Sequence, residues 1–244
     1  MKYTIIKSGL LIFSAFLIVV LPFFSLWQDD TVLPVGPANI LSENKNPLPI
    51  LLDAGHGGED GGAVGVDGIL EKDINLPVTL KTGTFLRFFG YPTDFTRKTD
   101  EMTCDDGLKT QRSKKVSDIK NRFSMLENGN YSCFLSIHQN FFGGNAHGAQ
   151  IFYGPKNGES AALAEALQSH LILLLQKDNK RVIKPVTDDV YIVYRTNKPA
   201  VLAECGFISN REDAEMLKNE SYQNKLAFVL TAGTIQYLTE REVI

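Results

Sequence analysis

The sequence predicts a single α/β domain, with a roughly six-stranded, mostly parallel or mixed sheet that helices cover on both faces. Short apolar segments alternate with helical patterns from residue 48 onwards, and this alternation is typical of α/β sheets. The composition, with 43% hydrophobic and 22% charged residues, is that of an ordinary globular protein. A long apolar run near the N-terminus precedes the expected domain.

Residues 1–28 are expected to be a membrane anchor or a signal segment. Lysines precede an uncharged run over 8–28, and Asp29 and Asp30 follow it. The run is long enough to cross a bilayer, which takes about 20 apolar residues. Its length and the lack of an A-x-A pattern at its end favour an uncleaved anchor over a cleaved signal. Either reading predicts an extracytoplasmic protein, membrane-anchored or secreted, because the lysines mark the cytoplasmic side.

A linker is expected over residues 29–47, which are rich in Pro, Asn and Asp, and the folded domain over 48–244. Its first strand is predicted at 48–53, an apolar run that ends in a glycine-rich loop. Its first helix is predicted at 71–90, where apolar residues recur at helical spacing. The proline at position 77 fits this helix if Asn75 caps the helix start, which would put the proline in the first turn.

The remaining elements are predicted from apolar runs and helical periodicity. A densely charged segment, 98–115, is expected to begin as an exposed loop. Five further strands are expected at 91–97, 131–138, 148–154, 190–194 and 199–204. Further helices are expected at 108–128 and 159–176, with a short helix and then a long one over 211–240.

Charge and cysteine content exclude several kinds of protein. The net charge is -3 and the sequence has no long Lys/Arg block, which argues against non-specific nucleic-acid binding. The three cysteines are an odd, sparse set without C-x-x-C spacing. They therefore predict neither a disulfide framework nor a structural zinc knuckle.

Four ionisable residues stand where elements of the predicted sheet begin or end. His56 lies three residues beyond the first strand, His138 ends the third, and Glu204 ends the last. Sites of open α/β sheets form at the carboxyl ends of strands, so these side chains are expected to converge. Glu71 opens the first helix, after a glycine-rich loop that can fold back toward His56.

These residue types suit a catalytic zinc site. Two histidines, one carboxylate and a water form a standard catalytic zinc site, and a second carboxylate can move the proton. His56, Glu71, His138 and Glu204 would fill these four roles. Each residue alone also fits a purely structural role, such as a histidine in a turn or an acid at a helix N-terminus. Glu204 is the hardest to dismiss, because a buried acid must be paired or functional.

Four stretches, in order, resemble the motifs of one enzyme family: DAGHGGEDGGAVG, ILEKDINL, FLSIHQN and PAVLAECGFISN. The family is that of the zinc-dependent N-acetylmuramoyl-L-alanine amidases, third amidase family, and the resemblance covers roughly residues 49–240. It implies that His56, Glu71 and His138 bind Zn²⁺ and that Glu204 acts in catalysis. The implied reaction is hydrolysis of the amide bond between the lactyl group of N-acetylmuramic acid and L-alanine in peptidoglycan.

Within that family the pattern resembles the germination-specific, CwlD-type amidases. The N-terminal apolar segment, the single catalytic domain and the stretch TQRSKKVSDIKNR at 110–122 carry this resemblance. It implies a role in spore cortex maturation through the muramic-δ-lactam pathway, and leaves room for an accessory protein. A vegetative cell-wall amidase and a non-catalytic wall-binding protein that retains the fold are the alternatives. The chain departs from the family pattern at Gln139, Ala54 and Pro77, and none of these departures removes a ligand.

Two further residues are candidates for substrate binding. Asn140 follows the third strand, where it would orient a ligand or touch substrate, although an asparagine there is as often a turn residue. Arg195 suits peptide carboxylates, although a solvated arginine is the commoner case. His147 and His170 are expected not to be ligands.

Other hydrolase chemistries are rivals to the amidase. A cysteine peptidase would use Cys205 with His138 as its base. Cys205 adjoins Glu204 on a strand, so the two side chains point to opposite faces and only one can face the site. A zinc carboxypeptidase or a polysaccharide deacetylase acting on the same polymer would share the metal but release different products.

Overall fold

The structure, a computed structural model, describes residues 47–242. The predicted anchor or signal segment, 1–28, and all but the last residue of the predicted linker, 29–47, lie outside the described residues. None of the helices within the described part of the chain has the length and apolar character needed to cross a membrane.

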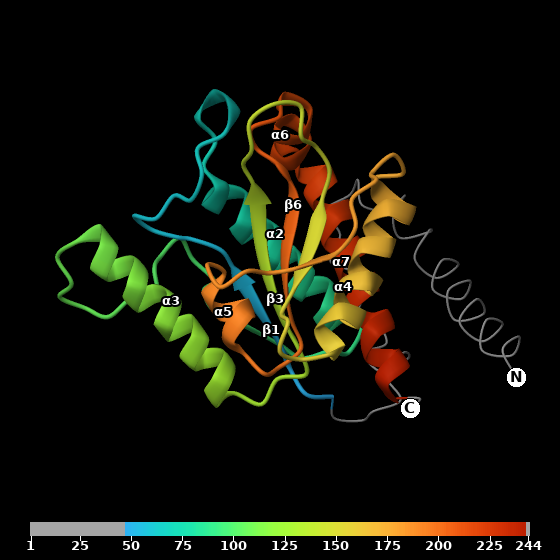
Figure 1. The fold of residues 1–244 in the computed structure, drawn as a ribbon, viewed down its shortest axis with the longest axis horizontal. Helices are drawn as coiled ribbons and strands as arrows, with labels where there is room; N and C mark the ends of the chain where they lie inside the picture. Colours follow the sequence, from blue (N-terminus) through green and yellow to red (C-terminus); the bar gives the residue numbers. More distant parts are fainter. Residues whose placement is uncertain (1–46, 243–244) are drawn as a thin grey trace, which may run out of the picture. The chain divides into compact units, whose positions relative to one another are not determined.

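The described residues form a mixed six-stranded sheet at the centre of the fold (Figure 1). The strands are β1 (Ile50–Ala54), β2 (Thr93–Phe95), β3 (Phe134–Asn140), β4 (Gln150–Tyr153), β5 (Lys184–Pro185) and β6 (Ala200–Phe207). Their order is β2-β1-β3-β6-β4-β5, and each neighbouring pair is parallel except β4 and β6. The predicted fold class is confirmed.

Helices cover both faces of this sheet. They are α2 (Glu71–Phe88), α3 (Gln111–Asn128), α4 (Glu159–His170), α5 (Tyr191–Arg195), α6 (Arg211–Lys218) and α7 (Glu220–Glu242), with a 3-10 turn at Val66–Gly68 and a π-helical turn at Leu171–Leu175. Helices α2 and α4 both pack against α7, whereas α3 packs with α5 (Figure 1). The predicted helix 159–176 is thus α4 plus the π-helical turn, and 211–240 is a short and a long helix as predicted.

Alternate residues of the central strands face the two helical layers. Leu51 of β1 belongs to a buried cluster with Leu126 of α3 and Val193 of α5. Its neighbour Leu52 points the other way, because a Cβ added to Gly83 of α2 would lie 3.2 Å from Leu52 Cδ1. Strands buried on both faces read as continuous apolar runs, which is why the sequence reveals them clearly.

The prediction of a strand at 190–194 was wrong, since these residues mostly lie in helix α5. The segment is rich in strand-forming residues, but strand preference depends on the packing that surrounds it. In the structure Val193 is buried against α3, and the ring of Tyr191 contacts Phe123 of that helix. The sixth strand is instead β5, at Lys184–Pro185, whose two exposed residues carry no apolar signal.

The first helix begins at Glu71 as predicted, but the expected cap was wrong. Helix α2 begins at Glu71 with Leu70 as its N-cap, so Pro77 lies inside the helix and Asn75 does not cap it. An internal proline removes one helical hydrogen bond. Tertiary packing outweighs that loss, since Val78 next to the proline is fully buried.

Candidate metal centre

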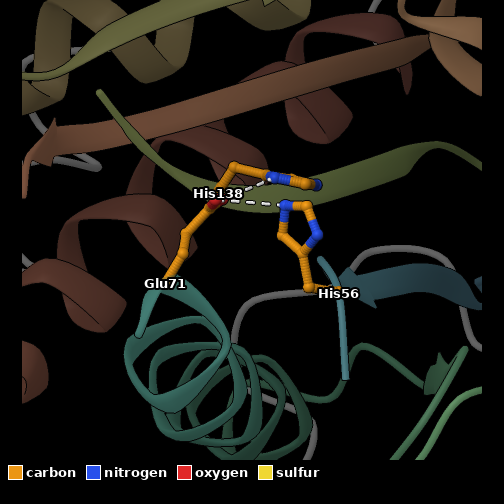
Figure 2. A group of neighbouring side chains, drawn as sticks. All are labelled: His56, Glu71 and His138. Atoms are coloured by element: carbon orange, nitrogen blue, oxygen red, sulfur yellow. Dashed lines mark hydrogen bonds and ion pairs between the residues drawn. The ribbon is translucent and has the colours of Figure 1, made fainter. Parts of the chain in front are cut away.

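The three predicted ligands lie together at the carboxyl edge of the sheet. His56 is in the loop after β1, Glu71 is the first residue of α2, and His138 is near the end of β3 (Figure 2). One ligand atom from each of these residues lies within 4.8 Å of the other two. Strands β1 and β3 are neighbours in the sheet. After β1 the chain continues to β2, toward one edge, and after β3 it continues to β4, toward the other edge. Binding crevices form at such switch points.

Glu71 occupies the middle of this group. Its Oε2 atom lies 3.1 Å from Nε2 of His56, and its Oε1 atom lies 2.8 Å from Nδ1 of His138 (Figure 2). The backbone N–H groups of Ala63 and Gln139 also donate to this carboxylate, at 3.0 and 3.1 Å. Burial by itself would raise the pKa of Glu71, but the hydrogen bonds to the two histidines lower it far below its usual range. Glu71 is therefore held as a carboxylate.

A second carboxylate orients His56. Nδ1 of His56 lies 2.9 Å from Oδ2 of Asp60, which leaves Nε2 turned toward Glu71. Metal-binding histidines commonly present one ring nitrogen to the metal and give the other to a carboxylate. Burial opposes protonation of His56, yet hydrogen bonds to Asp60 and Glu71 raise its pKa to about 9. The carboxylates of Glu71 and Asp60 thus strongly favour a positive charge among the gathered side chains.

Two glycines let the ligand loops approach one another. A Cβ added to Gly55 would lie 2.2 Å from Nε2 of His138. One added to Gly62, which has φ +71°, would lie 2.6 Å from Oε2 of Glu71 and 2.7 Å from Cδ2 of His56. Both positions therefore exclude any larger residue without displacing a member of the group.

Glu204 lies beside the cluster, on β6. It is paired in register with His138 on the neighbouring strand, so the two residues are adjacent across the sheet. Its Oε2 atom is buried, and no group in the described part of the chain donates a hydrogen bond to it. Burial raises the pKa of Glu204 to about 7, against the opposing influence of His138. Buried oxygens without a partner are rare, and this one lies next to the three gathered ligands.

The two predicted substrate-binding residues lie in different places. Asn140 ends β3, two residues beyond His138, and its carbonyl accepts a hydrogen bond from the N–H of Ile208. Arg195 is exposed at the end of α5, and its guanidinium lies 4.8 Å from the centre of the Tyr191 ring. Helix α5 precedes the start of β6, at the opposite end from the cluster. The structure therefore brings Asn140 close to the site and leaves Arg195 apart from it.

The other histidines and Cys205 lie outside the cluster. His147 is exposed in the loop after β3, and Nδ1 of His170, in α4, is 2.9 Å from the carbonyl oxygen of Ala166. The Cys205 side chain is fully buried, and burial raises the pKa of its thiol well above the usual range. A cysteine nucleophile must form a thiolate, so the structure disfavours the cysteine-peptidase reading.

A buried arginine that was not predicted supports the loop of His56. Arg122 of α3 forms ion pairs with Asp53 at 2.8 Å and Asp118 at 2.9 Å. It also donates to the carbonyl oxygen of His56 at 2.7 Å, where the His56 backbone has φ 61°. This network ties β1, α3 and the ligand loop together. The spacing of Asp118 and Arg122, four residues apart on one helix face, was the available signal.

Two buried amides near Glu71 were misread. Asn75 was expected to cap α2, yet its amide donates to Glu71 at 3.3 Å. Gln139 stood out only as a departure from the family pattern, yet its side chain contacts Asn75 at 3.1 Å. The four-residue spacing of Glu71 and Asn75 puts both on one helix face, which was a usable signal. Nothing in the sequence indicates the contact with Gln139, which lies on strand β3 and is remote from helix α2 in the sequence.

The fold and the site together fit one class of protein: the α/β hydrolytic enzymes whose ligand cluster could hold a metal ion. Two imidazoles and a carboxylate at one point, with a further carboxyl group beside them, are the groups that such enzymes use. The model of the family described as N-acetylmuramoyl-L-alanine amidase matches residues 50–236. The chain belongs to this family, which confirms the resemblance of its four motifs.

Several relatives have similar sequences and structures. The germination-specific N-acetylmuramoyl-L-alanine amidase of Bacillus subtilis is 33% identical over 193 residues, which cover 79% of this chain and 80% of the relative. The CwlD amidase of Clostridioides difficile, solved in complex with the GerS lipoprotein, is 39% identical with a TM-score of 0.76, over 79% of this chain and 99% of that one. The amidase AmiC2 of Nostoc punctiforme is 28% identical with a TM-score of 0.65, over 79% and 97%.

Proposed function

We propose that this chain is a zinc-dependent amidase that hydrolyses the bond between the lactyl group of N-acetylmuramic acid and L-alanine in peptidoglycan. Membership of the amidase family supports the reaction, and the amidase relatives support the substrate. The observation that carries the proposal is the convergence of His56, Glu71 and His138 beside Glu204.

The donor set fits a zinc ion. Two imidazole nitrogens and one carboxylate oxygen are common zinc ligands, and three protein ligands leave a position open for water or substrate. Asp60, bound to Nδ1 of His56, matches the carboxylate that usually orients such a histidine. When bound, zinc supplies a Lewis acid that activates water near neutral pH and polarises the scissile carbonyl.

Glu204 is the residue that we assign to proton transfer. Within residues 47–242 no donor satisfies its Oε2 atom, so this oxygen is available to accept a proton from the attacking water. The water oxygen bonds to the lactyl carbonyl carbon, and the bond from this carbon to the nitrogen of L-alanine breaks. Glu204 then returns the proton to that nitrogen. The products are a lactyl carboxylic acid and a peptide with a free amino terminus.

The setting that we propose is maturation of the spore cortex. Two relatives support it, since one is named as a germination-specific amidase and the other as a CwlD amidase. A vegetative wall amidase is the alternative. Spore-type and vegetative wall, digested in parallel, would separate the two, because a cortex enzyme is expected to prefer the former.

An accessory protein and an extracytoplasmic location complete the proposal. The C. difficile relative was solved with a lipoprotein, and this supports a lipoprotein partner for the activity of this chain. Peptidoglycan lies outside the cytoplasmic membrane, and the apolar segment at 1–28 would export or anchor the domain. Amidase activity measured with and without such a lipoprotein tests whether the partner is needed.

The products of a digest test the central proposal. We expect the full-length chain with Zn²⁺ to release free L-alanine amino termini from peptidoglycan, detected by mass spectrometry. Release of terminal D-alanine would instead identify a carboxypeptidase, and release of acetate a deacetylase. Either result, or intact muropeptides under conditions where a known amidase cleaves them, would overturn the proposal.

A further inference from the structure

We propose that Asn75 and Gln139 form a buried amide pair that positions Glu71 for metal binding. This inference rests on the proposed function, because it takes Glu71 to be a zinc ligand. Both amides are buried, with relative exposures of 0% for Asn75 and 3% for Gln139. Neither reaches the point where the three ligand atoms meet, so both are positioning residues.

Asn75 joins the helix of one ligand to the loop of another. Its Nδ2 atom donates to Oε1 of Glu71 at 3.3 Å, and Glu71 lies one turn earlier on α2. The same NH₂ group donates to the carbonyl oxygen of Gly55 at 3.1 Å. Gly55 immediately precedes His56, so one side chain holds Glu71 and the His56 loop at a fixed separation.

Gln139 extends this connection to the strand of the third ligand. It follows His138 on β3, and its Nε2 atom donates to Oδ1 of Asn75 at 3.1 Å. Its backbone N–H donates to Oε1 of Glu71 at 3.1 Å. Asn75 therefore contacts, directly or through one bond, all three elements that carry the predicted ligands.

The oxygens of Glu71 and Gly55 determine which way round the Asn75 amide lies, and Gln139 supplies a donor to its other end. An amide has a donor end and an acceptor end of nearly equal size. In the observed orientation Oδ1 of Asn75 accepts a hydrogen bond from Nε2 of Gln139, and its NH₂ group faces the oxygens of Gly55 and Glu71. A rotation by half a turn would set Oδ1 of Asn75 against the Glu71 carboxylate and the Gly55 carbonyl. It would also set two NH₂ groups against each other. Gln139 thus satisfies the acceptor end of Asn75 while its donor end is directed at Glu71.

This arrangement accounts for the glutamine in FLSIHQN. A smaller residue at position 139 would leave Oδ1 of Asn75 without this donor, and a buried amide without its partner is costly to maintain. The carboxylate of Glu71 gains a third donor at Oε1 beside the ring of His138 and the backbone of Gln139. A ligand fixed in this way loses less freedom when it binds a cation. Partners that orient ligands typically contribute about 10–100-fold to metal affinity.

Zinc affinity of full-length variants tests the inference. Asn75→Leu keeps the shape of the side chain but removes the amide, and Gln139→Met removes the donor to Asn75. Thr82→Val is the matched control, because Thr82 is also fully buried on α2 but its hydroxyl donates within its own helix and its carbonyl accepts from α7. Competition with a chromophoric chelator gives the zinc Kd. Thermal unfolding of the metal-free chain reports stability separately.

We expect Asn75→Leu to weaken zinc binding about 10–100-fold and Gln139→Met to weaken it less, while Thr82→Val leaves the Kd unchanged. Because Gln139 acts through Asn75, Gln139→Met should have no further effect on the Kd in the Asn75→Leu background. If Asn75→Leu does not fold, Gln139→Met decides, since it leaves both bonds of the Asn75 donor end in place.

The possible failures are distinguishable. A wild-type chain that does not bind zinc overturns the proposed function and this inference with it. A wild-type chain that binds zinc, with Asn75→Leu and Gln139→Met both matching it in Kd, overturns this inference alone. Equal weakening by Thr82→Val would also overturn it, because the effect would then be a general loss of stability.

Discussion

His138 and Glu204 occupy matching positions on neighbouring parallel strands, β3 and β6. The pairing sets a proposed metal ligand and the proposed proton-transfer group side by side on two inner strands of the sheet. Sites built on strands hold their geometry more closely than sites built on loops. The loop of His56 is the exception, and Arg122 and Asn75 fix it through the carbonyl oxygens of His56 and Gly55.

The first prediction concerns Glu204. Glu204→Gln keeps the size of the side chain but cannot take up a proton, so turnover should fall by at least about 100-fold. Zinc content should stay at about one ion per chain, because Glu204 is not among the three gathered ligands. Mass spectrometry of released peptides and elemental analysis measure the two quantities. Glu59→Gln is the control, since Glu59 is exposed and pairs with Lys114. Wild-type turnover in Glu204→Gln would refute the assignment.

The second prediction concerns metal removal. A chelator should abolish release of L-alanine amino termini, and added Zn²⁺ should restore it. A thiol reagent should leave activity intact, because Cys205 is fully buried and its thiol is held protonated. Zinc that binds only the folded chain should also raise the melting temperature in proportion to the logarithm of its concentration. Activity that survives chelation and is lost to the thiol reagent would point instead to a cysteine enzyme.

The third prediction concerns acid stability. Burial alone would raise the pKa of Asp53, but Arg122, His138 and the hydrogen bonds from Ser136 and Thr96 together lower the pKa to about 2. A lowered pKa stabilises the fold above the unfolded value, and this contribution is lost as the pH falls from about 4 to about 2. Its size is on the order of 2 kcal/mol, since one pKa unit corresponds to about 1.4 kcal/mol.

Urea unfolding at pH 6 and pH 3 checks this contribution. Asp53→Asn should be destabilised at pH 6, because it leaves the buried Arg122 with Asp118 as its remaining acidic partner. It should also lose less stability than the wild type on going to pH 3. Asp67→Asn, which alters an exposed pair with Arg211, should behave like the wild type. An Asp53→Asn chain with the full wild-type loss between the two pH values would contradict the account.

The sequence was sufficient for five of the six strands and for the gathering of the ligands, for a physical reason. Buried parallel strands are continuous apolar runs, and side chains at their carboxyl ends must share one edge. Local sequence patterns do not predict which side chains of different helices and strands will contact one another. Helix α5 forms where the local preference is for a strand, because Val193 packs against α3. Likewise, the amide of Asn75 faces Gly55 and Gln139, which are remote in sequence.

The last prediction separates backbone strain from contact with the site, through two glycines. Gly62 and Gly68 have similar left-handed backbones, with φ +71° and +75°. A Cβ at Gly62 would lie 2.6 Å from Oε2 of Glu71, whereas a Cβ at Gly68 would meet nothing within 4 Å.

Both alanine variants should lose about 1 kcal/mol of stability from backbone strain. Only Gly62→Ala should also displace Glu71, and so weaken zinc binding by about 10-fold or more and reduce turnover with it. Chelator competition and urea unfolding on both variants measure the two effects. Equal zinc affinity in the two variants would mean that Glu71 is not a ligand, or that the loop can move away without loss.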